Sequence, residues 1–245
     1  MKKLIFLTYP YLIIAVFFAI ISCDKHNNTE DTPQKENSKK EEPKKGDSSL
    51  LAYSKPFYLF TETKAYEMTK QEKDPYLKKL YYQIAATPTA EWFEGVEAFD
   101  DTTLKRLIEG AKAQQKTPII TLYGIPYRDC GSYSTGGHKT AASYKAWINR
   151  TSAIIGKTPI IVIVEPDAIN YCNHKKGTPQ YNERAELLTY VGKTLKNNNP
   201  NVVTYLHAGN SVLVTAHPEA VATAVIDGGL EYMQGFVLNV SGLGG

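Results

Sequence analysis

The sequence predicts an α/β fold built on a parallel β-sheet, and two observations along the chain support this class. From about Phe57 onward, apolar segments typical of strands alternate with segments of helical spacing. Several of the strand segments are continuously apolar, which indicates strands that are buried on both faces. Hydrophobic residues make up 42% and charged residues 22% of the 245 positions, a balance typical of soluble globular proteins.

The first half of this region predicts two helices and two strands. Residues 69–87 repeat apolar side chains at helical spacing, and TAEWF at 89–93 is a short strand candidate. The next helix is expected at 100–115, because the capping cluster Asp100–Thr103 precedes a second helical repeat. The apolar segment TPIITLYGI at 117–125 predicts the second strand.

The second half continues the alternation with three helices and three strands. These are expected, in order, at 141–156 (helix), 158–169 (strand), 181–198 (helix), 201–209 (strand), 217–229 (helix) and 233–242 (strand). Glycines close the first and last of these helices, as is common at helix ends. The segment IIVIV in the first of these strands is the clearest fully buried strand in the chain.

The first fifty residues are expected to lie outside the domain. Residues 1–23 combine a Lys-Lys start, an apolar segment and small residues before Cys23, as in a secretory signal peptide of the lipoprotein type. A transmembrane anchor and a plain secretory cleavage site are the alternatives. Residues 24–50 are almost entirely polar and predict a disordered linker, which leaves 51–245 as the domain. We therefore expect an exported protein, attached to a bacterial membrane through lipid on Cys23 or secreted.

The chain has three cysteines, at positions 23, 130 and 172. If Cys23 carries lipid, the two that remain in an exported protein favour one disulfide between Cys130 and Cys172, although spacing alone does not establish their approach. No His/Cys cluster has the spacing of metal ligands, so no metal or other cofactor is expected. The net charge of +3 is spread along the chain and predicts no nucleic-acid partner.

Candidate functional residues follow the predicted strands, because ligands of α/β sheets bind at the carboxyl ends of strands. They are Trp92, the segment Tyr123–Asp129, the segment Glu165–Asp167, the segment His207–Asn210, and Asn239. Two carboxyl groups, Asp129 and Asp167, stand at neighbouring strand ends, and paired carboxyl groups are what glycoside hydrolysis requires. Asp167 ends a very apolar strand and is expected to be the proton donor, while Arg128 would keep Asp129 or Glu165 ionised. Capping or salt-bridge roles are the structural alternative.

A family resemblance sharpens this hypothesis. LYGIPYRDC followed by a Gly/Ser loop, then VIVEPDAI, then NVVTYLHAG, resembles glycoside hydrolase family 6, the cellulases that invert configuration at β-1,4-glucan bonds. The similarity extends over roughly residues 55–241 and includes the opening segments KPFYLF and ATPTAEWF. It implies a distorted parallel β/α barrel of the TIM type, which is expected to be incomplete because the family domain continues beyond the NVSG segment. The implied partner is cellulose or another β-glucan.

The resemblance also implies roles for individual residues. It places the proton donor at Asp167, its supporting aspartate at Asp129, and a tyrosine that favours sugar-ring distortion at Tyr123. A mobile loop falls on 132–137, and the disulfide-bonded cysteine beside the aspartate falls on Cys130. Substrate contacts are expected at Trp92, Ser134, Thr135, His207, Asn210 and Asn239.

The chain departs from the family pattern after the TYL strand. The family usually shows Asp-Ala-Gly-His there, with tryptophans following, whereas this chain has His207 and Asn210 at the two polar positions. The part of the family domain expected beyond the NVSG segment is missing from this sequence, and this leaves a second hypothesis, a non-catalytic glucan-binding surface lipoprotein that keeps the fold. A structural envelope lipoprotein without a sugar role is the third, and the presence of Asp129, Asp167 and Tyr123 argues against it.

Overall fold

The computed structural model describes residues 52–95 and 98–240 of the 245. The expected signal peptide at 1–23 and linker at 24–50 lie outside these described residues. Within them, none of the helices combines the length and the apolar character that crossing a membrane requires.

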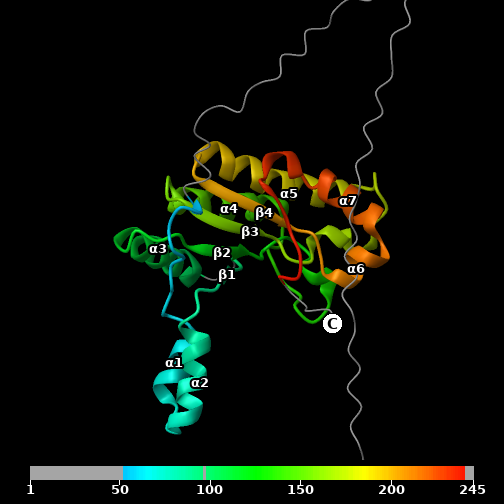
Figure 1. Ribbon diagram of the computed structural model, residues 1–245. Helices are drawn as coiled ribbons and strands as arrows, with labels where there is room; N and C mark the ends of the chain where they lie inside the picture. Colours follow the sequence, from blue (N-terminus) through cyan, green and yellow to red (C-terminus); the bar gives the residue numbers. More distant parts are fainter. Residues whose placement is uncertain (1–51, 96–97, 241–245) are drawn as a thin grey trace, which may run out of the picture. The chain divides into compact units, whose positions relative to one another are not determined.

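A five-stranded parallel sheet forms the centre of the described chain (Figure 1). Its strands are β1 (Glu91–Phe93), β2 (Ile119–Leu122), β3 (Ile160–Val164), β4 (Val202–His207) and β5 (Gly235–Val237), adjacent in that order. The register pairs Leu122 with Val164 and Val164 with Leu206, so the carboxyl ends of the central strands meet along one edge. Among the described residues, β1 and β5 do not pair with each other, and the sheet is therefore not closed into a barrel.

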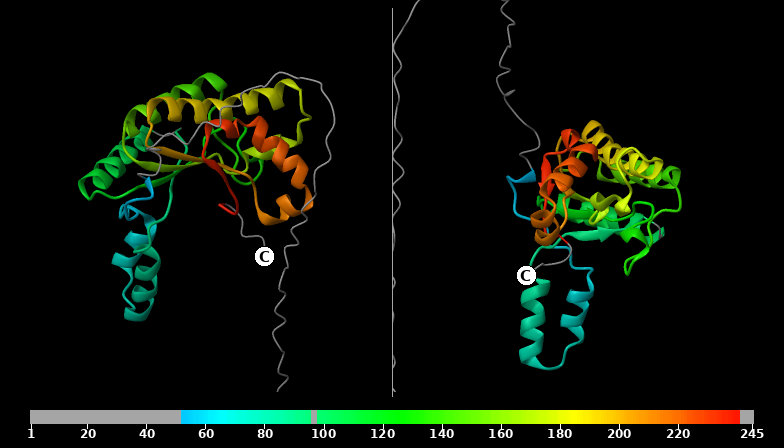
Figure 2. Two further views of the ribbon diagram at one scale, coloured as in Figure 1. Left: turned by 45° about the horizontal axis from the view of Figure 1, so that its top comes forward. Right: turned by 90° about the vertical axis from the view of Figure 1, so that its right-hand side faces the viewer.

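The main core lies on one face of the sheet, beneath four helices (Figures 1 and 2). These are α3 (Ala98–Ala113), α4 (Ala141–Ile155), α5 (Pro179–Asn198) and α7 (Pro218–Asp227). Ile148 and Leu188 from two of them are fully buried in one cluster with Val162 of β3. On the opposite face Ile161 and Val203 form a much smaller cluster with Ala52. Helices over one face only are typical of a barrel wall, whereas open doubly wound sheets carry them on both faces.

The predicted strands and most predicted helices are confirmed, with two differences. The single helix expected at 69–87 is wrong, since the structure has α1 (Lys64–Gln71) and α2 (Pro75–Ala85) instead. Pro75 stands at the first turn of α2, and the carboxylate of Asp74 accepts hydrogen bonds from two of its backbone amides, which begins a new helix there. The short helix α6 (Ser211–Ala216) was not expected, because it has too few turns to show a period.

Asp100 holds the turn that follows β1, and its loss is expected to destabilise the fold. The side chain is buried, and its Oδ2 accepts hydrogen bonds from Glu94 N (3.1 Å) and Gly95 N (2.8 Å). Asp100→Ala would leave both amides without these partners and should lower the free energy of unfolding in urea by about 2 kcal/mol. The neighbouring Asp101→Ala removes only a partly exposed salt bridge to Arg150 and should cost less than about 1 kcal/mol. Equal losses in the two variants would contradict this role for Asp100.

Candidate active site

A disulfide brings the two predicted acids to one place. Asp129 begins the short helix η2 (Asp129–Gly131) after β2, and Asp167 precedes η3 (Ala168–Asn173) after β3. Cys130 and Cys172 are joined by a disulfide with their Cα atoms 5.2 Å apart, as predicted. This bond crosses between the two segments and ties the loop that carries Asp129 to the loop that carries Asp167.

Asp167 is held from behind by a buried histidine. Its backbone N–H donates to Nδ1 of His207 at 2.9 Å, and one carboxylate oxygen lies 4.0 Å from the same nitrogen. The Asp167 side chain is 34% exposed, whereas the His207 side chain is fully buried. Burial lowers the pKa of His207, opposed by the negative charge of Asp167. Since Nδ1 accepts a hydrogen bond, the proton of the neutral ring lies on Nε2.

Asp129 is fixed by the loop that follows it. Its Oδ2 accepts a hydrogen bond from Ser134 N at 2.9 Å. The expectation that Arg128 keeps Asp129 or Glu165 ionised is corrected here, because the ion partner of Arg128 is Glu94 at 2.9 Å. The guanidinium group of Arg128 also donates to two backbone carbonyl oxygens of the surrounding segment, those of Tyr123 and Ser134, both at 2.8 Å.

Trp92 and Tyr123 form an aromatic pair beside the acids. Their ring centroids are 5.3 Å apart in an edge-on arrangement, and Trp92 is 42% exposed. Burial raises the pKa of Tyr123, and the negative charges of Asp167 and Asp129 raise it further, so both carboxylates lie within electrostatic reach of the phenol. An exposed ring next to polar groups suits a sugar, which has apolar faces and a rim of hydroxyl groups.

The remaining predicted contact residues lie on the neighbouring loops. Ser134 and Thr135 are exposed on the loop after η2, where their carbonyl oxygens accept from the Arg128 side chain at 2.8 and 3.5 Å. Asn210 caps α6 through Leu213 N at 2.9 Å. Asn239, beyond β5, accepts from Ser211 N at 2.9 Å, so these two asparagines hold adjacent backbone segments at the ends of β4 and β5.

Two buried ionisable side chains lie at this edge: Glu165, which the sequence placed among the strand-end candidates, and Arg184, which sequence reasoning missed. Glu165, directly after β3, is fully buried and accepts hydrogen bonds from Gly124 N, Ile125 N and the hydroxyl of Tyr144. Arg184 of α5 is also buried, and its Nη2 donates to the carbonyl oxygens of Pro126 (3.0 Å) and Tyr127 (2.9 Å). An arginine on the apolar face of a helix was the available signal, since Tyr181, Leu187 and Leu188 around it are all buried.

The ionisation of Glu165 predicts a pH-dependent stability. Burial raises its pKa from 4.5 to about 7, while the hydrogen bonds it accepts and the nearby charge of Arg184 oppose the rise. The folded state binds this proton more tightly than the unfolded chain does. The resulting contribution of Glu165 to the free energy of unfolding is therefore complete below about pH 4.5 and is lost as the pH rises through about 7. In urea unfolding, the free energy of unfolding of the wild type should thus fall between pH 5 and 8. In Glu165→Gln this part of the fall should be absent. Parallel pH profiles for the two proteins would contradict the assignment.

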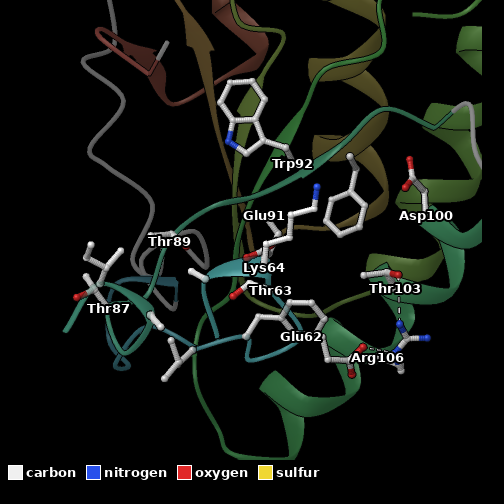
Figure 3. A pocket seen from close by; sticks show the side chains of 16 residues that line it. Glu62, Thr63, Lys64, Thr87, Thr89, Glu91, Trp92, Asp100, Thr103 and Arg106 are labelled. Atoms are coloured by element: carbon white, nitrogen blue, oxygen red, sulfur yellow. Dashed lines mark hydrogen bonds and ion pairs between the residues drawn. The ribbon is translucent and has the colours of Figure 1, made fainter. Parts of the chain in front are cut away.

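A separate cavity of about 380 Å³ lies beside β1 (Figure 3). Residues from α1, α3 and the segment before β1 line it, including the ion pair of Arg106 with Glu62 at 2.8 Å. Figure 3 shows Trp92 at the far end of this cavity from Arg106. Neither Asp129 nor Asp167 lines it, so the cavity is distinct from the acid pair. Across the described residues no group of three or more His, Cys, Asp or Glu side chains is arranged to hold a metal ion.

Comparisons with known proteins identify the family of the chain. The family model described as Glycosyl hydrolases family 6 matches residues 49–244. Endoglucanase A of Thermobispora bispora is 29% identical over 170 residues, which are 67% of this chain and 37% of that protein. Endoglucanase 1 of Streptomyces halstedii is 33% identical over 159 residues, covering 64% of this chain and 49% of that protein. The chain thus spans less than half the length of these two relatives.

A solved structure shows the same relationship in three dimensions. The endoglucanase Cel6 from Mycobacterium tuberculosis superposes with a TM-score of 0.68 at 32% identity, over 78% of this chain and 64% of that chain. The extent of the family match, over most of the chain, and the similarity of the folds agree. The chain belongs to the glycosyl hydrolases of family 6.

Proposed function

We propose that the protein hydrolyses β-1,4-glucosidic bonds in cellulose or a related β-glucan with inversion of configuration, and that Asp167 is the general acid. The observation that carries the proposal is the disulfide between Cys130 and Cys172, which ties the loops of Asp129 and Asp167 together beside Tyr123. The relatives named above are endoglucanases, and the solved relative is in complex with methyl-cellobiosyl-4-deoxy-4-thio-β-D-cellobioside.

The proposed reaction uses one proton and one water molecule. The carboxylic acid of Asp167 donates its proton to the glycosidic oxygen as the bond from that oxygen to the anomeric carbon breaks. A water molecule attacks the anomeric carbon from the opposite face and gives up a proton to a base, which yields the inverted product. The partly exposed position of Asp167 supports the donor role, since 34% of its side chain is accessible from outside. Asp129 supports the acid as the second carboxyl group of the pair.

The aromatic pair and the loop residues are proposed to bind the sugar. Trp92 offers its exposed ring to a pyranose face, and Tyr123 lies beside the sugar at the bond to be cleaved. The side chain of His207 is fully buried, so it does not present a donor to a sugar in this structure, although its Nε2–H has no hydrogen-bond partner within the described part of the chain. The remaining contacts are proposed at Ser134, Thr135, Asn210 and Asn239.

The test is hydrolysis by the chain itself. Reducing-sugar release from carboxymethylcellulose should be measurable, and proton NMR of a short cello-oligosaccharide digest should show the α-anomer of the new reducing end first. A first product in the β-configuration would contradict inversion. Retained binding to swollen cellulose without any hydrolysis would overturn the catalytic proposal in favour of the glucan-binding lipoprotein.

We also propose that the protein is exported and that Cys23 carries lipid. The support is the sequence Ile20-Ile21-Ser22-Cys23 after an apolar segment, which resembles the lipidation site of bacterial lipoproteins. In a bacterial host, the wild type should partition into the detergent phase of a Triton X-114 extract and incorporate labelled palmitate. Cys23→Ser should do neither, and labelling of that variant would contradict the assignment.

A further inference from the structure

We propose that Glu165 and Arg184 are positioning residues that fix the backbone of residues 123–127 from two sides and thereby set where Tyr123 and Asp129 stand relative to Asp167. The inference rests on the proposed function, because it assigns these two buried side chains a part in the same site.

The clamped segment, residues 123–127, leaves β2 and carries Tyr123 at one end and the start of the Asp129 loop at the other. Its amides at 124 and 125 donate to the Glu165 carboxylate at 3.0 Å, and its carbonyls at 126 and 127 accept from Arg184. The side chains of Glu165 and Arg184 thus supply the hydrogen bonds that a neighbouring strand would supply in a sheet. They fix the irregular backbone of the four residues 124–127.

Glu165 also connects the two acid-bearing loops. Its own backbone lies at the end of β3, where its N–H donates to Leu122 O at 2.9 Å and its carbonyl accepts from Ala168 N at 3.2 Å. Only Pro166 separates it from Asp167. A movement of the Glu165 side chain would therefore change the distance between the clamped segment and Asp167.

The energetic cost of this arrangement argues for a positional role. Glu165 is completely buried and Arg184 is 6% exposed, and burying such groups is unfavourable because they lose their hydration by water. Apolar side chains of similar size would fill the same space without that cost. They would not hold the amides at 124 and 125, and Gly124 leaves no room for a side chain there, since a Cβ would lie 2.4 Å from Glu94 O.

Two measurements on Glu165→Gln test the proposal. Gln keeps the size of the side chain but offers one neutral amide oxygen in place of two carboxylate oxygens. Gly124 N therefore loses one of its two acceptors (3.0 and 3.1 Å), and the bonds to both amides become weaker. Hydrogen exchange at Gly124 and Ile125 should accelerate at least tenfold. On a soluble cello-oligosaccharide, kcat should fall by about 10- to 100-fold with KM changed less than threefold, because small misplacements of catalytic groups reduce the rate steeply.

Two further variants separate positioning from general destabilisation. Arg184→Lys keeps the positive charge but loses the planar guanidinium group that donates to two carbonyl oxygens. Its kcat should also fall, by a smaller factor than that of Glu165→Gln. Tyr181→Phe, on the same helix, removes a buried hydroxyl bond to Asp227 (2.6 Å) and should lower stability while leaving kcat and the exchange at Gly124 unchanged.

The outcomes are distinct. Unchanged exchange in Glu165→Gln overturns the clamp, and accelerated exchange with an unchanged kcat overturns its positioning role. A kcat loss in Tyr181→Phe as large as that in Glu165→Gln also overturns the role, because it would reflect stability alone. If the wild type does not hydrolyse glucan, the proposed function fails. The hydrogen-exchange rates at Gly124 and Ile125 then still test whether Glu165 holds the backbone.

Discussion

Asp167→Asn is expected to lower kcat on carboxymethylcellulose by about 100- to 10,000-fold, the range that a positioned general acid contributes. The amide has nearly the shape of the acid, but its N–H protons are not acidic enough to be transferred to the glycosidic oxygen. The backbone N–H of residue 167, which donates to His207, is unaffected by the change, so the fold of the loop should be kept. Binding of a cello-oligosaccharide should stay within a few-fold of the wild type, as measured by calorimetry.

The leaving group provides the control for this variant. A β-cellobiosyl fluoride needs little protonation to depart, so its hydrolysis should be almost unaffected in Asp167→Asn if the side chain acts as an acid. Asp101→Asn, a partly exposed carboxylate on α3, should match the wild type on both substrates. Equal losses on the fluoride and on the polysaccharide would show that Asp167 does not donate the proton.

The second large effect is expected from the disulfide. Cys130→Ser/Cys172→Ser opens a covalent link across 42 residues, which should lower the free energy of unfolding by about 4 kcal/mol on loop entropy. For a domain of this size the thermal midpoint should fall by about 10 °C. Cys130 and Cys172 both have positive φ, 53° and 50°, a conformation that ordinary residues adopt at a cost and that the link helps to maintain.

The activity of the same double variant should fall together with its stability, because the loops of Asp129 and Asp167 are no longer tied. Treatment of the wild-type protein with dithiothreitol should lower both its stability and its activity, and reoxidation should restore the two properties. If the double variant has the same thermal midpoint and the same rate of hydrolysis as the wild type, the disulfide does not hold the site together.

The strands could be predicted because apolar segments such as IIVIV have no other place than the centre of a sheet. Their order in the chain then placed Asp129 and Asp167 at neighbouring ends, and the cysteine count favoured the link between their loops. The family resemblance supplied the barrel type, which composition and periodicity did not distinguish from an open sheet.

What the sequence could not predict depends on contacts across the fold. Sequence reasoning offered Asp129 and Glu165 as partners of Arg128, whereas the structure pairs it with Glu94, which follows β1. The pairing of Arg184 with the carbonyls at 126 and 127 joins residues more than fifty positions apart. Neither local propensity nor hydrophobic period carries information about such partners.

The separation of the core from the strand ends has a consequence for evolution. The side chains that hold the sheet to its helices, such as Val162 and Leu188, lie on one face. Those that would touch a ligand, such as Trp92 and Tyr123, lie at or just beyond the strand ends along one edge. Exposed rim residues such as Tyr127 and Tyr133 can therefore be exchanged by descendants of this chain with little penalty to folding. Ligand preference can therefore change at the rim while the buried residues beneath it keep the fold.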